Sequence, residues 1–151
     1  MSNSKFKDNG ESIDYFIVNF SILLECLTCN KVVVATRNND EELGFRFICC
    51  NCGIVHKNNP MDSWERDTFY GFNTWLNTNC CGQTLWAYNK EHLHFMEGYI
   101  LSTLRERVPN LNQSLASRLP NWMKSAKNRE ELTNGFKILR KKLAEAEKLL
   151  K

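Results

Sequence analysis

The sequence is poor in the residues that dominate disordered and fibrous chains. Its 151 residues include only 3 prolines and 7 glycines, so neither a low-complexity nor a collagen-like chain is indicated. A hydrophobic fraction of 42% beside 25% charged residues predicts a packed core. The length suits one ordinary domain or two small ones.

No apolar run approaches the length of a membrane span. The longest run, residues 15–24, is interrupted by Asn19 and Ser21 and falls short of the roughly 20 residues that cross a bilayer. The polar residues 1–10 are not followed by the apolar core of an export signal. We therefore expect a cytoplasmic protein without membrane contact, in which most cysteines stay reduced.

Motifs of several enzyme classes are also missing. The sequence contains no GxGxxG, no GxxxxGK[ST] phosphate loop, no HExxH and no GxSxG. Its 3 histidines have no evident nucleophile or carboxylate partner. We expect a protein that is not an enzyme and has no small-molecule substrate. The remaining catalytic hypothesis is a reactive thiol, which requires a lowered pKa.

Cysteine, in contrast, is abundant. The chain has 7 cysteines, an odd number that does not suit a fully paired disulfide framework. Residues 26–29 (CLTC) and 49–52 (CCNC) form two CxxC units with 19 residues between them, followed by Asn30 and Gly53. This spacing is typical of zinc sites, because each CxxC turn directs two thiolates towards one point. Asn and Gly tolerate the left-handed backbone that such turns need.

The predicted metal ligands are Cys26, Cys29, Cys49 and Cys52. A closed set of four thiolates leaves no position for a substrate, so the predicted Zn²⁺ has a structural role. Cys50 is an alternative to Cys49, and Cys80 and Cys81 are alternative or additional ligands, with His92 or His94 as partners. The competing interpretation is a group of inert buried cysteines.

The pattern along the chain predicts an α+β fold with an N-terminal antiparallel zinc-ribbon-like β-sheet and a C-terminal helical section. We expect a flexible N-terminus at residues 1–12, the β region at 13–60, an aromatic-rich middle segment at 61–88 and the helical region at 89–151. Three β-branched and aromatic runs indicate strands of the sheet: residues 15–18, 31–34 and 45–48.

Two longer helices are predicted in the helical region. The first follows a cap at Asn89 and ends near residues 108–109, with an apolar stripe formed by Leu93, Met96, Ile100 and Leu104. Pro120 suits the first position of a short helix. Asn128 and Glu131 suggest a capping box for the last helix, whose stripe is Leu132, Phe136, Leu139 and Leu143. Gly135 in this helix is favourable only where close packing requires it.

Two further motifs carry a family resemblance. They are CCGxTLWAYN at residues 80–89 and SLASRLPxWMKSAKNR at residues 114–129. With the CxxC pair, the sequence resembles a family of small uncharacterised bacterial zinc-ribbon-containing proteins. The resemblance implies a bacterial zinc-ribbon protein and a role for the Cys80-Cys81 pair, but no particular activity.

The charge distribution suggests a partner. Residues 1–80 carry 7 Lys and Arg against 10 Asp and Glu, whereas residues 81–151 carry 13 against 7. The candidate nucleic-acid-binding residues are Arg118, Trp122, Lys124, Lys127 and Arg129, which combine phosphate attraction with a ring that can stack on a base. The competing interpretation is a solvated helix face around one buried tryptophan.

The alternative function is a protein-interaction or assembly factor that docks through its C-terminal helix. The apolar stripe of that helix would then be an exposed partner face, although a stripe with helical spacing more often belongs to the core.

Overall fold

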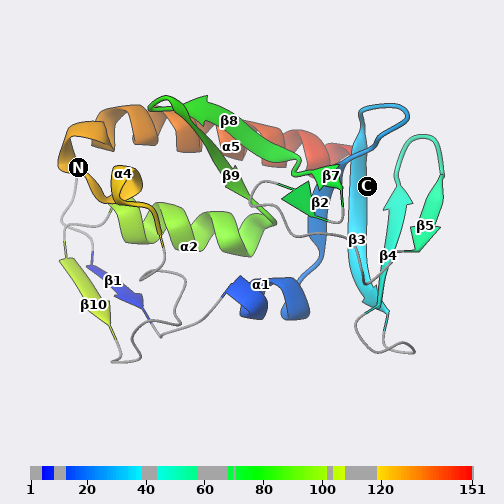
Figure 1. The fold of residues 1–151 in the computed structure, drawn as a ribbon, viewed down its shortest axis with the longest axis horizontal. Helices are drawn as coiled ribbons and strands as arrows, with labels where there is room; N and C mark the ends of the chain where they lie inside the picture. The colour runs from blue at the N-terminus through cyan, green and yellow to red at the C-terminus, as the bar shows by residue number, and fades with distance from the viewer. Residues whose placement is uncertain are drawn as a thin grey trace.

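The structure, a computed structural model, describes residues 5–8, 13–38, 44–57, 68–69, 71–101, 104–107 and 119–150. It confirms the predicted α+β class, with an antiparallel sheet in the N-terminal half and a helical section at the C-terminal end. Figure 1 shows the main sheet at one end of the molecule and the longest helix running from the opposite end towards it. None of the helices in the described ranges combines the length and apolar character that a membrane crossing requires.

The main sheet has four antiparallel strands in chain order. They are β2 (Ile22–Glu25), β3 (Val32–Asn38), β4 (Gly44–Cys49) and β5 (Val55–Lys57). Val33 pairs with Cys49 and Glu25 pairs with Val32. The β2–β3 and β4–β5 connections therefore lie at the same end of the sheet, and each connection carries one CxxC unit.

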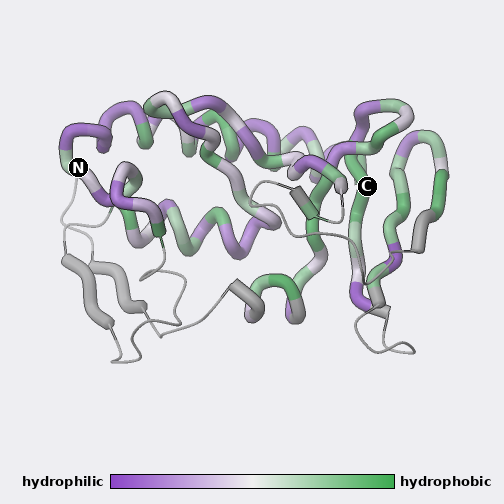
Figure 2. Tube along the Cα trace, viewed as in Figure 1, coloured by the Kyte–Doolittle hydropathy of each residue, from purple (hydrophilic) through white to green (hydrophobic). Residues whose placement is uncertain are grey.

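Strands β2 and β3 separate two hydrophobic cores. Leu23 and Val32 belong to the core that contains the helical section, whereas Leu24 and Val33 belong to a second core rich in phenylalanine. Successive residues of a strand point to opposite faces, so these strands are apolar on both sides. Figure 2 shows this as nearly continuous hydrophobic colour, in contrast to the alternating colours of the C-terminal helix.

The prediction of a strand at residues 15–18 is wrong. These residues lie in helix α1 (Ile13–Asn19). The apolar positions 13, 16, 17 and 20 follow the i, i+3, i+4, i+7 spacing of one helix face. Phe16 and Ile17 are buried, and Phe20 packs against the core. Burial of this face outweighs the weak strand preference of β-branched and aromatic residues.

The first predicted helix exists but ends earlier than expected. Helix α2 covers Lys90–Leu101, and the Asn89 side chain caps it by accepting a hydrogen bond from the backbone N–H of His92 at 2.8 Å. Leu104 belongs instead to strand β10 (Leu104–Arg107), which pairs in parallel with β1 (Lys5–Asp8). Residues 5–8, within the segment expected to be flexible, thus form a strand that pairs with a segment distant along the chain.

The aromatic-rich middle segment forms short antiparallel hairpins. Their strands are β6 (Thr68–Phe69), β7 (Phe72–Asn73), β8 (Leu76–Cys80) and β9 (Gln83–Ala87). The Leu23 backbone bonds this segment on both sides, donating to the Tyr88 carbonyl at 2.8 Å and accepting from the Trp75 N–H at 3.0 Å. The segment thereby joins the sheet to the helices.

The C-terminal helical section consists of α4 (Asn121–Lys124), the 3₁₀ helix η1 (Ala126–Asn128) and α5 (Arg129–Leu149). Pro120 precedes α4 as its N-cap and is not its first helical residue. The predicted apolar stripe of α5 is buried in the first core: Leu132, Phe136, Leu139 and Leu143.

The predicted capping box at the start of α5 is wrong. The Asn128 side chain donates to the carbonyl of Trp122 at 2.9 Å, and it makes no cap hydrogen bond. The Glu131 carboxylate accepts a hydrogen bond from the backbone N–H of Cys81, a residue of the β8–β9 turn. Both polar side chains therefore satisfy partners outside the helix, which compete with the local motif.

Candidate metal centre

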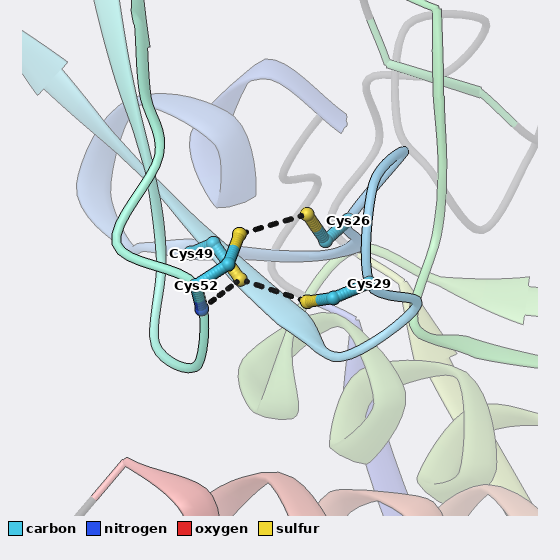
Figure 3. Close-up of side chains that lie close together, drawn as sticks. All are labelled: Cys26, Cys29, Cys49 and Cys52. Atoms are coloured by element: carbon cyan, nitrogen blue, oxygen red, sulfur yellow. Dashed lines mark hydrogen bonds between the residues drawn. The ribbon is translucent and has the colours of Figure 1, made fainter.

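Four cysteine thiols converge at the end of the main sheet. They are the predicted ligands Cys26, Cys29, Cys49 and Cys52, whose sulfur atoms all lie within 4.8 Å of one another. The Sγ atoms of Cys26 and Cys52 are 3.7 Å apart, and those of Cys29 and Cys49 are 3.4 Å apart (Figure 3). Bonds of about 2.3 Å to a tetrahedral zinc ion place neighbouring sulfurs about 3.8 Å apart. The cluster can therefore hold a metal ion with only small adjustments.

The two CxxC turns have the same backbone hydrogen bonds. In the first, the N–H of Cys26 donates to the carbonyl of Lys31 at 2.7 Å, and the N–H of Asn30 donates back to Cys26 at 3.1 Å. In the second, Cys49 donates to residue 54 at 3.0 Å and Gly53 donates back to Cys49 at 3.2 Å. In each turn the N–H of the first cysteine, residue i, thus donates to the carbonyl of residue i+5, and the N–H of residue i+4 donates to the carbonyl of residue i.

The residues with a left-handed backbone conformation occupy equivalent positions in the two turns. Asn30 has φ 62° and Gly53 has φ 74°, as the sequence predicted for the residue after each CxxC unit. Asn and Gly adopt this conformation at the lowest steric cost. Backbone N–H groups also point at sulfur, because Thr28 donates to Cys26 Sγ and Asn51 donates to Cys49 Sγ, both at 3.4 Å.

Backbone N–H groups of the CxxC turns favour the charged, thiolate form of some of the cysteines. A hydrogen bond from the backbone of Lys31 lowers the pKa of Cys29 to about 6, and one from the backbone of Cys29 lowers the pKa of Cys26. Cys52 receives such a bond from Ile54, but burial and proton sharing with the other thiols outweigh it and raise its pKa to about 12. A metal ion would replace these shared protons, because the thiolate is the ligating form.

The structure separates Cys49 from its neighbour Cys50. Cys49 is buried inside the cluster, whereas Cys50 is exposed and lies outside it. Partial desolvation, followed by the charge of Cys49, raises the pKa of the Cys50 thiol. The thiolate population at neutral pH is therefore small, unlike that of a reactive catalytic cysteine.

Among the side chains that the structure describes, Cys80 and Cys81 neither join the four-cysteine cluster nor form a group with a histidine. Their third neighbour is Glu131 of α5, and the three ligand atoms lie within 4.8 Å of one another. Glu131 was not predicted as a member of this group, because Cys81 lies 50 residues away along the chain and no local pattern reports such a pairing. His94 is exposed, and the side chain of His56 is outside the described residues.

His92 has a structural role. Its ring is buried, and Nδ1 accepts a hydrogen bond from the backbone N–H of Tyr88 at 3.0 Å. Burial lowers the pKa of His92 to about 3, so the ring is neutral at physiological pH. Because Nδ1 accepts this bond, Nε2 carries the proton of the neutral ring, and neither nitrogen has a free lone pair for a metal ion.

The five candidate nucleic-acid-binding residues have different environments. Arg118 lies outside the described residues. Arg129 donates from its guanidinium to a backbone carbonyl near the end of α2 at 3.0 Å, which gives it a structural contact. Trp122 is partly buried against the first core and Lys124 is half-buried, whereas Lys127 is exposed.

The face of α5 that was considered as a docking surface is occupied within the chain. Leu132, Phe136 and Leu139 have an exposed fraction of 0%. The apolar stripe therefore forms core, the usual role for residues with helical spacing.

No protein-family model matches this sequence, and the comparisons with curated proteins and with solved structures gave no match either. The resemblance to bacterial zinc-ribbon-containing proteins thus remains a prediction. The geometry of the cysteines is the observation from which a function can be argued.

Proposed function

We propose that Cys26, Cys29, Cys49 and Cys52 hold one structural Zn²⁺ ion, and that the protein acts by binding and not by catalysis. The equivalence of the two CxxC turns carries this proposal, because both present their thiols with the same backbone geometry at the same end of one sheet. Four thiolates suit Zn²⁺, a borderline-soft ion that is most often four-coordinate in structural sites.

The ion would connect the β2–β3 turn to the β4–β5 turn, at the end of the sheet where Val33 of β3 pairs with Cys49 of β4. Cys26 directly follows β2, and Cys49 is the last residue of β4. Cys29 and Cys52 lie in the turns that lead to β3 and β5. A ligand set of this kind rarely exists in an unfolded chain, so the free energy of binding contributes directly to folding. In this role zinc fixes the sheet against which both cores pack.

A metal count on single-cysteine variants tests this proposal. We expect Cys49→Ser to lower the number of Zn²⁺ ions per chain by one in native mass spectrometry, because it removes one of four ligands. Cys50→Ser is the matched control, since it removes the adjacent thiol and should leave the count unchanged. The opposite pattern, or a count that neither variant changes, would contradict the assignment.

We further infer that the partner is nucleic acid, bound at the segment formed by α4 and η1. The support is the excess of basic residues in the C-terminal half together with Trp122, Lys124 and Lys127 in this segment. Lysines attract phosphates, and a partly exposed indole ring can stack on a base. Arg129 is left out of the proposed contact set, because its guanidinium already bonds the end of α2.

Binding should be sensitive to salt. For a mixed-sequence DNA or RNA, we expect the slope of log K against log salt concentration to fall by about 1.4–1.8 in the double variant Lys124→Ala/Lys127→Ala, because each lost phosphate contact contributes roughly 0.7–0.9. The variant Lys137→Ala/Lys141→Ala removes the same charge from exposed positions of α5 and serves as the control. Equal slopes in the two variants, or no binding at low salt, would reject this interface.

A further inference from the structure

The turn between β8 and β9 contains a cysteine where its backbone favours another residue. Cys80 pairs with Gln83, which leaves Cys81 and Gly82 as a two-residue turn. Both have positive φ, 55° and 75°, as in a type I′ turn, where Asn-Gly is the preferred sequence. The left-handed conformation is unfavourable for cysteine. Turn geometry therefore gives no reason for a thiol at position 81.

The surroundings of this thiol supply a chemical reason. The Sγ atoms of Cys80 and Cys81 are 3.3 Å apart, and the Glu131 carboxylate completes a group of three ligand atoms within 4.8 Å. The backbone N–H of Cys81 donates to the same carboxylate and holds it beside the thiols. Helix α5 is pressed against the turn, because a Cβ added at Gly135 would lie 3.5 Å from Cys80 Sγ.

Two thiolates and one carboxylate belong to the ligand types of Zn²⁺ and related thiophilic cations. Three protein ligands leave a fourth position for water or another donor, unlike the closed set of four cysteines. The position is accessible, since Cys81 is half-buried and Glu131 is exposed. The buried Cys80 provides the anchored side of the group.

We propose that Cys80, Cys81 and Glu131 form a second metal site, open at one coordination position, for a thiophilic divalent cation of the zinc class. Cation binding displaces the two thiol protons and neutralises two of the three negative charges that the ligands then carry. The site is independent of the four-cysteine cluster, because the two groups share no residue.

Burial and a hydrogen bond with Cys81 raise the pKa of Cys80 to about 12, and burial also raises the pKa of Cys81. Thiols of this kind are poor nucleophiles at neutral pH and react slowly with oxidants, because the thiolate is the reactive form. The thiolate is also the ligating form, so cation binding must displace both protons and should strengthen as the pH rises.

The test is a Zn²⁺ titration of the full reduced chain, followed by native mass spectrometry. We expect two ions on the unmodified protein and one on Cys81→Asn, a variant that gives the turn its preferred residue and so keeps the hairpin folded. Cys50→Ser removes a thiol outside both groups and should retain two ions. Cys49→Ser removes the other ion, so the two sites are separately distinguishable.

Glu131→Gln provides a second, milder variant. Its amide oxygen can still accept the hydrogen bond from the Cys81 backbone, but the charged ligand is lost. We expect affinity at the second site to fall at least ~10-fold, since outer-shell substitutions alone cost that much. An equal ion count in Cys81→Asn and the unmodified protein would overturn the proposal, as would a Cys80–Cys81 disulfide that resists the reductant when zinc is present in excess.

Discussion

His92 is a titratable residue that the fold keeps uncharged. Its ring packs against Phe16 and Trp86, with ring centroids 5.5 Å and 5.6 Å away, and its Nδ1 accepts the Tyr88 N–H. A protonated ring would lose this acceptor and place a charge in a buried site, which is unfavourable. Folding therefore selects the neutral form and links stability to pH.

We expect His92 to make the protein sensitive to acid. Its pKa is 6.5 in a model compound and about 3 in the fold, so the stabilisation from keeping it neutral is complete above pH 6.5 and is lost as the pH falls towards 3. The loss is roughly 1.4 kcal/mol per pH unit. His92→Gln keeps a hydrogen-bond acceptor without titrating. Urea denaturation across this pH range should show a shallower decline for the variant, and equal declines would contradict this role.

The residues of the four-cysteine cluster were predictable because their pattern is local. The spacing of the CxxC units identified the four cysteines that converge, and the conformational preferences of Asn30 and Gly53 fixed the turns. Glu131 was not predictable, because its sequence context matches a capping box and its actual partner, Cys81, is distant along the chain. A local pattern cannot report a competing long-range contact.

Helix α5 is held in position by contacts with both β8 and α2. Lys142 connects it to the β8 region twice: its carbonyl accepts from Trp75 Nε1 at 2.8 Å, and its Nζ donates to the Asn77 carbonyl at 2.6 Å. Arg140 forms an ion pair with Glu97 of α2 at 3.2 Å. The helix is thus joined both to the β8 region and to α2.

Gly135 allows the close approach of α5 to the β8–β9 hairpin. A Cβ at this position would lie 2.8 Å from Leu85 Cδ2, which is fully buried. We expect Gly135→Ala to be destabilising by up to about 2 kcal/mol, because overpacking costs roughly 1–3 kcal/mol and improved helix propensity returns about 1. The adjacent exposed position supplies a control, since Asn134→Ala gains propensity without a clash. A Gly135→Ala protein as stable as Asn134→Ala in urea would refute the packing argument.

Elements with one clear periodicity were predicted better than ambiguous ones. The stripe from Leu132 to Leu143 identified α5 correctly, because it persists over several turns. Residues 15–18 satisfy both a strand composition and a helical spacing, and only packing on the core decides between them. The end of α2 depends on the pairing of β10 with β1, which neither segment reveals alone.

On the scale of the whole molecule, strands β2 and β3 of the main sheet contribute side chains to both cores. Leu23 and Val32 pack on the side of the helices, while Leu24 and Val33 pack on the phenylalanine-rich side. A disturbance at the end of β2 and β3 that carries the four-cysteine cluster therefore reaches both cores. The α2–α5 section, in contrast, has its own contacts with β8 and β9.

Chelation of zinc should accordingly produce a graded loss of structure. We expect amide hydrogen exchange to accelerate first in residues 26–52 and the melting temperature to fall, because metal binding contributes free energy to folding. Exchange in α5 should rise less. Chelator added to Cys49→Ser, which lacks a complete ligand set, should have little effect at this site. Uniform exchange throughout the chain, or no change after zinc removal, would contradict this view.

The apolar character of β2 and β3 on both faces has a consequence for how the strands are aligned. A slip of one residue would exchange the aliphatic side chains of Leu23 and Leu24, or of Val32 and Val33, between two equally apolar cores, so hydrophobicity discriminates weakly between registers. The same slip would move a cysteine by about 3.3 Å, far beyond the roughly 0.2 Å tolerance of a metal–ligand bond. Coordination of one ion by four thiols would thus stabilise the correct register selectively. It would disfavour misaligned pairings that hydrophobic packing alone excludes only weakly.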